Sequence, residues 1–299
     1  MPSIASLSPR VLSSVSVKNI QPPSIYTTNL VVHLDAGKTA SYAGSGTAWT
    51  DLSGNSNNFT LKKGQTSSST TALGPTYSIT NSNYGMQFEP GGIYNGDAGV
   101  DGANAQWLQG ADTILNNYST GTIEFWLQTL AKTRPLDFRD SASSVAGVAY
   151  SHCLTSRQCN GVYSHAVFSI GAYCNSSGQP ELGTAGKLYW HGTNGVTTAV
   201  STGTISNGTV YQVVVAFSGT NCKFYINGTL DSTTSGNYSV PTSGGNAANY
   251  GTTIGVWPVS GYNFHQFAGS IYNVKVYNTQ LNDSQVLQNY RAVKGRFGL

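Results

Sequence analysis

The chain has 299 residues, of which only 9% are charged, and its 15 Lys and Arg against 12 Asp and Glu give a formal net charge of +3. This balance provides no basic stripe to neutralise phosphates, so composition argues against a nucleic-acid ligand. No run of about 18 apolar residues occurs, which argues against a transmembrane helix. The surface must be hydrated mainly through amides and hydroxyls, because Gly, Ser, Thr and Asn are plentiful.

The first 26 residues are expected to form an extended N-terminal arm. Arg10 and many serines interrupt the apolar region that a secretory signal peptide requires, so we expect no cleaved leader. Chain termini are usually ordered only where something holds them. We therefore expect residues 1–26 to contact a neighbouring chain.

Beyond the arm, short runs rich in Val, Ile, Tyr, Phe and Thr recur between turns rich in Gly, Asn and Ser. This pattern predicts an all-β fold, a two-sheet antiparallel sandwich or jelly roll, rather than a parallel α/β sheet. The predicted strands cover residues 30–35, 84–89, 122–129, 166–170, 187–190, 210–217, 223–227, 252–256 and 269–277. Linkers are scarce, so we expect one sandwich over residues 27–281.

The clearest unit of this pattern is a meander of three strands within residues 210–232. Hydrophobic residues alternate along 210–217, and the turn at 218–221 leads into a second strand whose Phe224 and Ile226 share a face. The dipeptide Asn227-Gly228 follows, and Asn-Gly is the strongest short signal for a hairpin.

A single helix is predicted near the C-terminus, within residues 282–299. Asn282 or Asp283 can cap it, and Gly295 is expected to end it. Its apolar positions, which we expect to pack on the sandwich, are Val286, Leu287, Tyr290 and Val293.

Four cysteines are too few for a disulfide scaffold in a chain of this length. Cys153 and Cys159 lie in a loop-like stretch beside His152, but their spacing is wider than structural zinc sites use. Free thiols or one loop disulfide are therefore favoured over zinc. The pairing of Cys153, Cys159, Cys174 and Cys222 stays open at this point.

Three stretches together resemble a known family. Residues 29–61, 210–232 and 254–299 are similar, in that order, to the concanavalin A-like lectin/glucanase superfamily in its laminin-G-like form. The resemblance implies a jelly-roll sandwich. In it, Trp49 and the turn at residues 51–54 look like a clamp on a long connection, and Phe267, Gly269 and Ile271 would return a strand through the core.

The first of these stretches, residues 29–61, and the C-terminal pattern QNY-x-A-x-KGRFG further resemble structural proteins of tailed phages and large DNA viruses. That resemblance implies a non-enzymatic virion protein, such as a minor capsid, decoration or tail-associated component. It would bind other virion proteins or copies of itself through residues 1–26. The alternative is a carbohydrate-binding adhesin, extracellular or at a cell surface, that recognises host glycans.

Hydrolysis is disfavoured because the required carboxylates are missing. Retaining glucanases need two carboxyl groups about 5 Å apart, which alternate strand positions would supply. Glu89, Glu124 and Glu181 have no acidic residue two or four positions away, and Arg139 between Asp137 and Asp140 indicates a loop ion pair. No phosphate or dinucleotide fingerprint is present either. We expect no catalytic residues and no enzyme.

Two loops combine aromatic rings with amide or imidazole groups, as a shallow sugar site requires. The candidate residues for glycan binding or an interface are Trp190 and His191 in the first loop, and Trp257, Tyr262, Asn263 and His265 in the second. Trp and Tyr also occur in protein cores and interfaces, and packing in a core or an interface is the favoured interpretation of these residues.

A Gly-rich loop suggests one metal site. Asp97, Asp101 and Asn104 offer oxygen ligands that could hold calcium. Calcium takes six to eight oxygens, so these three side chains supply only part of the set. A solvated turn is the competing interpretation, and no other cofactor is expected.

Overall fold

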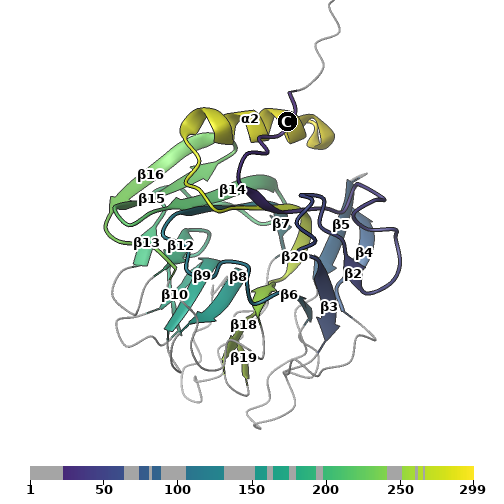
Figure 1. Cartoon of the computed structure of the whole chain (residues 1–299), viewed down its shortest axis with the longest axis horizontal. Coiled ribbons are helices and arrows are strands. Elements are labelled where there is room, and N and C mark those ends of the chain that lie inside the picture. Colours follow the sequence, from purple (N-terminus) through teal and green to yellow (C-terminus); the bar gives the residue numbers. More distant parts are fainter. Residues whose placement is uncertain are drawn as a thin grey trace, which may run out of the picture.

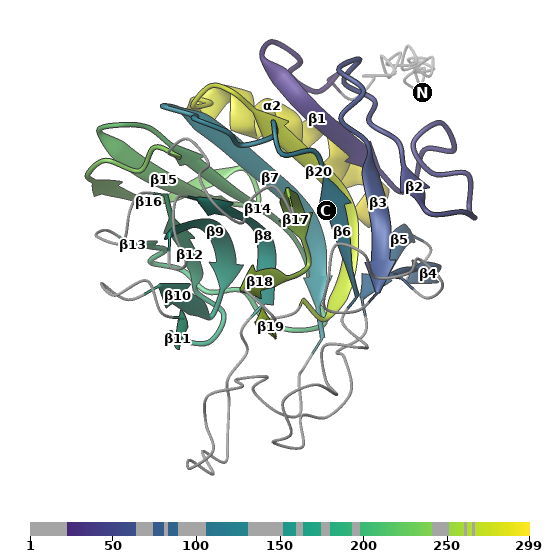
Figure 2. The ribbon, with the colours of Figure 1, turned by 60° about the horizontal axis from the view of Figure 1, so that its bottom comes forward.

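Two antiparallel sheets pack face to face in the computed structural model (Figures 1 and 2). The structure describes residues 23–63, 74–80, 83–88, 106–130, 152–159, 164–174, 180–192, 198–240, 251–259, 262–264 and 267–299. The predicted all-β sandwich is confirmed.

The first sheet, called sheet I, has eight strands within the described residues. They are β1 (Leu30–Asp35), β4 (Thr76–Thr80), β5 (Asn83–Phe88), β7 (Gly121–Thr129), β14 (Val210–Phe217), β15 (Asn221–Ile226), β16 (Thr229–Ser235) and β20 (Gly269–Tyr277). Their order is β16-β15-β14-β7-β20-β5-β4, and β1 also pairs with β20. The pairing of β1 with β20 joins the two ends of the sandwich domain.

The second sheet, sheet II, has the order β13-β12-β9-β8-β17-β6-β3-β2 in the described part. Its strands are β2 (Ala48–Trp49), β3 (Phe59–Lys63), β6 (Gln106–Gly110), β8 (His152–Cys159), β9 (Ser164–Ile170), β12 (Leu188–His191), β13 (Thr198–Val200) and β17 (Thr252–Ile254). Two hairpins, β10 (Ala172–Cys174) with β11 (Pro180–Leu182) and β18 (Trp257–Val259) with β19 (Tyr262–Phe264), lie at the end of the molecule opposite the helix (Figure 1).

The core fills the space between the two sheets. Phe125 on β7 meets Phe168 on β9 with ring centroids 6.1 Å apart, and Phe168 also contacts Phe224 on β15. Alternate residues of each strand point inward because side chains alternate along a strand. Burying each large side chain contributes about 2 kcal/mol to the stability of the sandwich.

The two middle strands of sheet I are buried along their whole length. All nine residues of β7 and all nine of β20 are buried. One face of these strands meets the core, and the other is covered by the C-terminal helix α2 (Asp283–Val293) and the following turn η2 (Lys294–Phe297) (Figure 1). The middle of the sheet therefore has no solvent face.

The helix begins where the sequence predicts. Asn282 is its N-cap, and the reciprocal hydrogen bonds between Asn282 and Gln285 form a capping box. Val286 packs on the sheet as expected, but the second fully buried position is the polar Asn289. The α-helix ends at Val293 with Lys294 as its C-cap, directly before the predicted end at Gly295, but the chain continues through Gly295 as the turn η2, and the residue with positive φ is Gly298 at 72°.

The predicted meander is confirmed as β14, β15 and β16. Asn227 and Gly228 have φ values of 51° and 76°, the left-handed conformations that a tight hairpin of this kind requires. The clamp at residues 49–54 is also confirmed, since Trp49 is buried and Asp51 accepts hydrogen bonds from the backbone N–H groups of His33 and Ser53.

One predicted loop is a strand. Residues 152–159 form β8, in which Cys153 is a buried thiol. Six steps along a strand separate Cys153 and Cys159 by about 20 Å, so these two cysteines do not share a disulfide or a zinc ion. Cys222 on β15 is a buried free thiol.

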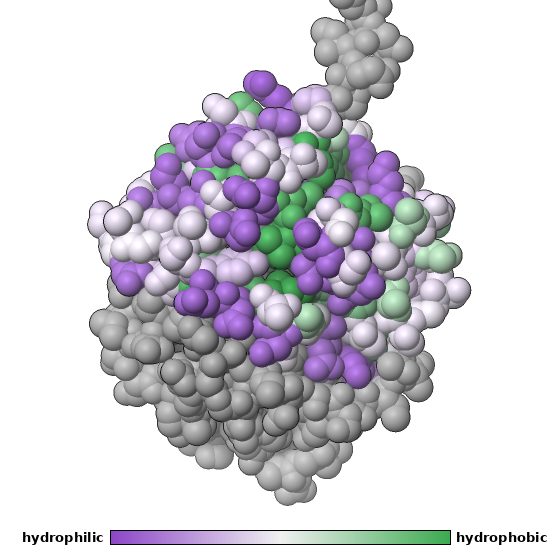
Figure 3. All heavy atoms as spheres, in the orientation of Figure 1, coloured by the Kyte–Doolittle hydropathy of each residue, from purple (hydrophilic) through white to green (hydrophobic). Residues whose placement is uncertain are grey.

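The described residues contain no helix long and apolar enough to cross a membrane. Among the described residues on the face seen in Figure 3, most are hydrophilic or intermediate in hydropathy, and hydrophobic residues form a strip between them. This distribution agrees with the low charge and high amide and hydroxyl content of the chain.

Candidate functional site

Trp190, one of the predicted glycan-binding residues, lies in the core. Its side chain is fully buried on β12, its ring stacks on Phe217 at 4.5 Å, and its indole N–H donates to the carbonyl of Tyr238 at 3.2 Å. Gly192 allows this close approach, because a Cβ there would lie 2.2 Å from the same carbonyl. Trp190 is therefore not available to a ligand at the surface.

His191, the next residue, is also buried. Its Nδ1 lies 3.3 Å from the hydroxyl of Thr198, and its Nε2 has no hydrogen-bond partner. Burial lowers the pKa of His191 to about 4, so the ring is neutral at physiological pH. This imidazole is a structural group of sheet II in the described fold.

The other predicted aromatic residues fall on the hairpin of β18 and β19, which lies beside β8 (Figure 2). Trp257 pairs with Phe264, and Val259 pairs with Tyr262, so these four positions share one face of the ribbon. Asn263, paired with Pro258, occupies a position on the opposite face. His265 lies outside the described residues.

The calcium candidates Asp97, Asp101 and Asn104 also lie outside the described residues. Within the described ranges, no three His, Cys, Asp or Glu side chains gather as a metal site would require. The acidic residues Glu89, Asp137 and Asp140 lie outside these ranges too.

Glu124 is enclosed between sheet I and α2. One carboxylate oxygen is 2.8 Å from the Lys275 ammonium, and the other accepts a hydrogen bond of 2.8 Å from Asn289. Both members of the Glu124–Lys275 pair are fully buried. A carboxylate held in this way cannot reach a sugar at the surface, and its position supports a structural role.

An exposed aromatic surface occurs elsewhere, at the β4 edge of sheet I. The rings of Tyr42 and Tyr77 lie 5.0 Å apart, and those of Tyr77 and Tyr84 stack at 5.4 Å with an interplanar angle of 8°. We call these three residues the tyrosine ladder. The ladder passes from the buried Tyr42 to Tyr84, which is 43% exposed.

The inner part of the ladder is fixed by hydrogen bonds. The hydroxyl of Tyr42 donates to the carbonyl of Gly46 at 2.8 Å, and that of Tyr77 donates to the carbonyl of Ala36 at 3.1 Å. Burial is the main cause that raises the pKa of both phenols. Tyr84 is thus presented on a rigid base, opposite Ile79 on β4, which is 60% exposed.

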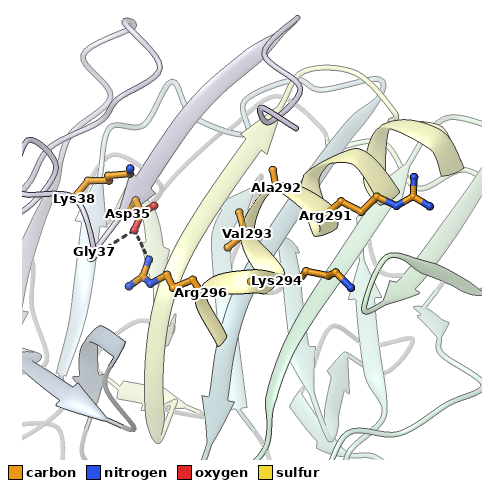
Figure 4. Close-up of a pocket in the computed structure, with 9 residues that line it drawn as sticks. Asp35, Gly37, Lys38, Arg291, Ala292, Val293, Lys294 and Arg296 are labelled. Carbon is orange, nitrogen blue, oxygen red and sulfur yellow. Dashed lines mark hydrogen bonds and ion pairs between the residues drawn. The ribbon is translucent and has the colours of Figure 1, made fainter. Parts of the chain in front are cut away.

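A cationic pocket adjoins the ladder (Figure 4). It encloses about 470 Å³ between the turn after β1 and the end of α2, and its lining residues are Asp35, Gly37, Lys38, Arg291, Ala292, Val293, Lys294, Gly295 and Arg296. Arg296 connects the two features, because its guanidinium donates to Asp35 at 2.6 Å and to the backbone carbonyl of Tyr84 at 2.6 Å.

Gly37 makes room for this arginine. A Cβ at that position would lie 2.5 Å from the guanidinium carbon of Arg296. The backbone N–H of Gly37 also donates to Asp35 at 2.8 Å, so the carboxylate is held from two sides. The turn after β1 therefore positions Arg296 at the border between pocket and ladder.

Neither the ladder nor the pocket is recognisable from the amino-acid sequence. Their residues come from segments near positions 38, 77, 84 and 296, and no local spacing connects them. The basic, aromatic tail that includes Lys294 and Arg296 was the one available signal, and it gave no indication of what the tail would contact.

The comparisons with known proteins agree on the fold. No curated protein matches the sequence. Among solved structures, domain 4 of AbnA, an extracellular arabinanase from Geobacillus stearothermophilus solved with arabinotriose, is 14% identical with a TM-score of 0.53, covering 90% of this chain and 100% of that domain. The fold thus occurs as a part of a glycosidase.

Two further structures are similar. The Trypanosoma rangeli sialidase in complex with sialic acid is 14% identical with a TM-score of 0.54, and the match covers 93% of this chain and 36% of that one. Botulinum neurotoxin type C, whose cell entry depends on interaction with two ganglioside molecules, is 10% identical with a TM-score of 0.50. The match covers 89% of this chain and 52% of the neurotoxin chain. This chain thus spans about a third of the solved sialidase chain and about half of the solved neurotoxin chain.

The family assignment rests on the sequence as well as on the fold. The family model of the concanavalin A-like lectin/glucanases superfamily matches residues 101–287, which is more than half of the chain. This range includes β7, β14 and β20, the middle strands of sheet I. The chain belongs to the concanavalin A-like lectin/glucanase superfamily.

Proposed function

We propose that this protein is a non-catalytic module that binds carbohydrate at the tyrosine ladder. The observation that supports this proposal best is the exposed ring of Tyr84, which is stacked on one side by Tyr77, while the backbone carbonyl of Tyr84 accepts a hydrogen bond from Arg296. The apolar face of a sugar ring packs on an aromatic ring, and nearby polar groups bind its hydroxyls. A rigid ring also loses little conformational entropy when a ligand binds.

The comparisons support the same class of ligand. The similar structures include a domain solved with arabinotriose, a sialidase solved with sialic acid and a toxin that interacts with gangliosides. All of these ligands are carbohydrates or carry them.

A binding role without cleavage is favoured by the state of the carboxylates. Glu124 is buried and paired with Lys275, and Asp35 is paired with Arg296. Neither carboxylate is free to act as an acid or a nucleophile on a sugar at the ladder.

A glycan array tests the proposal. We expect the wild-type chain to bind glycans and Tyr84→Ala to weaken that binding by about tenfold, because the stacking surface is lost. Tyr84→Phe is the matched control and should bind nearly as the wild type does, since it keeps the ring.

A second variant separates this site from the hairpin predicted from the sequence. If Trp257→Ala abolishes binding while Tyr84→Ala does not, the glycan site lies at β18–β19 instead of the ladder. Failure of the wild-type chain to bind any glycan would contradict the proposed function as a whole.

We also propose, as a second candidate, a structural role in a virion with residues 1–26 as the assembly arm. This proposal is supported by hydrogen bonds that attach the last residues of the arm to α2. The Tyr26 N–H donates to Asn289 at 2.8 Å, and Gln288 donates to the carbonyl of Ser24 at 2.9 Å. An arm fixed beside α2 would leave the sandwich at a defined place.

Deletion of residues 1–22 tests the assembly role, since it keeps Ser24 and Tyr26. The shortened chain should fold and remain soluble but no longer join its particle or its own copies. Normal incorporation of the shortened chain into purified particles would exclude the arm as the assembly element.

A further inference from the structure

The cationic pocket concentrates charge in a chain that has little of it. Of the 15 lysines and arginines in the sequence, four line this pocket: Lys38, Arg291, Lys294 and Arg296. Asp35 is the one acidic residue in the lining and is already paired with Arg296. The lining therefore has a formal charge of four minus one, or +3, which equals the net charge of the whole chain.

Three of these cations have no acidic partner within the described part of the chain. Lys38 and Arg291 form no ion pair there, and Lys294 makes one contact, a cation–π approach of 5.6 Å to Tyr290. Arg296 uses two of the five N–H donors of its guanidinium, for Asp35 and for the carbonyl of Tyr84. Donors to an anion are thus available at the pocket.

The cations stand on two sides of an apolar strip (Figure 4). Lys38 and Arg296 lie on the side of β1, whereas the side chains of Arg291 and Lys294 extend away from β1. Ala292 and Val293 lie between the two sides. A ligand that carries negative charge beside an apolar surface matches these cations and the apolar residues between them better than a small inorganic ion does.

The helix dipole explains part of this arrangement but not all of it. Cations are favoured at the C-terminal end of a helix, which accounts for Arg291 and Lys294. It does not account for Lys38, which follows β1, or for the fixed position of Arg296. The bonds of Arg296 to Asp35 and Tyr84 instead hold a preorganised donor at the border of the ladder.

We propose that the pocket binds the carboxylate of an acidic glycan whose sugar ring rests on Tyr84. This inference rests on the proposed carbohydrate-binding function and specifies its ligand class. Lys38 and Arg296 bind the carboxylate nearest the ladder, and Arg291 and Lys294 attract further negative charge along the same chain. Charge-assisted hydrogen bonds of this kind are stronger than those between neutral groups.

The test uses the full chain and a glycan array on which each carboxylate-bearing glycan is printed beside its neutral analogue with the same core. The hits are then titrated calorimetrically in about 20 mM and about 300 mM NaCl, a range over which exposed charges become screened. We expect the acidic member of each pair to bind more tightly, with a preference that shrinks in the higher salt.

The decisive variant is Lys38→Gln with Lys294→Gln. It should weaken binding of the acidic glycan by about tenfold at low salt and leave the neutral analogue unchanged, as expected for the loss of two partly exposed charge contacts. The matched control is Lys63→Gln with Lys223→Gln, which removes the same charge from residues outside the pocket lining. The control should keep the preference.

The outcomes separate this inference from the proposed function. If acidic and neutral partners bind equally and the double variant changes neither, the pocket inference is overturned while carbohydrate binding stands. If sulfated or phosphorylated chains bind as well as carboxylated ones, the carboxylate assignment is overturned. If no glycan binds, the proposed function fails, and the inference fails with it.

Discussion

At the residue scale, polar side chains decide how the outer face of sheet I is closed. Asn289 on α2 accepts a hydrogen bond from the Tyr26 N–H and donates to Glu124 and to the hydroxyl of Tyr277, each at 2.8 Å. Lys275 bonds Glu124 at 2.8 Å and Asn273 at 2.7 Å. A buried network of this kind is favourable only while its members remain paired.

Lys275→Met should therefore be strongly destabilising. The substitution leaves the Glu124 carboxylate buried without its cation, and we expect the free energy of unfolding to fall by about 3–5 kcal/mol in urea titrations. The double variant with Glu124→Gln should recover part of this loss. Lys223→Met is the control, because its ion pair with Asp283 is partly exposed, so that loss of the pair should cost less than about 1 kcal/mol.

A second residue-scale prediction concerns pH. Burial lowers the pKa of His191 to about 4, and burial followed by the charge of Lys275 lowers that of His33 to about 4, from 6.5 in each case. Both folded pKa values lie below the unfolded ones, so folding favours the neutral rings. Stability is complete above about pH 6.5 and is lost as the pH falls from 6.5 towards 4.

Urea titrations between pH 7 and pH 4 measure this effect. His191 alone accounts for about 3 kcal/mol over that range. His191→Gln cannot titrate, so its stability should depend less on pH than that of the wild type. An equal loss of stability in both proteins would show that His191 is not the group responsible.

At the element scale, α2 acts as a cover for sheet I rather than as a separate appendage. Val286 belongs to the same buried hydrophobic cluster as Val214 and Tyr277. Asn289 connects the helix both to the sheet and to the segment around Tyr26 through hydrogen bonds. Most helix stability in proteins comes from such tertiary packing. Removal of Asn289 should consequently loosen both the helix and the segment around Tyr26.

Asn289→Ala tests this coupling. We expect a loss of about 3 kcal/mol, because Glu124 and Tyr277 each lose a buried hydrogen-bond partner. Hydrogen exchange should show faster exchange in α2 and in residues 24–26 together. Gln288→Ala, which removes one exposed contact, should change stability by about 0.5 kcal/mol or less.

The start of the helix provides a smaller and independent effect. Asn282→Ala removes the capping box and should cost about 1 kcal/mol in the same urea assay. Asn282→Asp keeps an acceptor for the Gln285 N–H and should be close to neutral. A similar loss in both variants would mean that the cap is not the cause.

At the scale of the whole molecule, distant pairings control folding. β1 pairs with β20 across almost the entire sandwich domain, and β7 lies between β14 and β20. Sheets built from non-local contacts fold slowly, because loop closure precedes the stabilising contacts. We expect refolding from urea to take about a second or longer in stopped-flow fluorescence. Complete refolding within a millisecond would contradict this.

The elements of this fold are largely readable from the sequence. Alternating hydrophobic residues located β14, and the Asn227-Gly228 turn located the start of β16, because both are local signals. The cap of α2 was readable for the same reason. The loop expected at residues 152–159 was wrong, since its polar residues pair with β9 inside sheet II.

The candidate site was not readable in this way. Trp190 sits among buried residues on both faces of β12, so alternation could not tell whether its ring faces the core. The pocket requires Lys38 and Arg296, which are far apart in the sequence, to line the same cavity, and no local sequence pattern predicts this. Local propensities place elements, whereas a site at the junction of distant segments follows only from how these pack.

The stacking around Trp126 provides the protein with an optical reporter of its own. The indole of Trp126 lies parallel to Tyr290 at 5.6 Å and to Phe297 at 4.9 Å, and its N–H donates to Glu124 at 3.2 Å. Indole emission responds to polarity and to nearby rings, so undocking of α2 from the sheet would shift the emission of this tryptophan. The attachment of the C-terminal segment can thus be followed in the unlabelled chain.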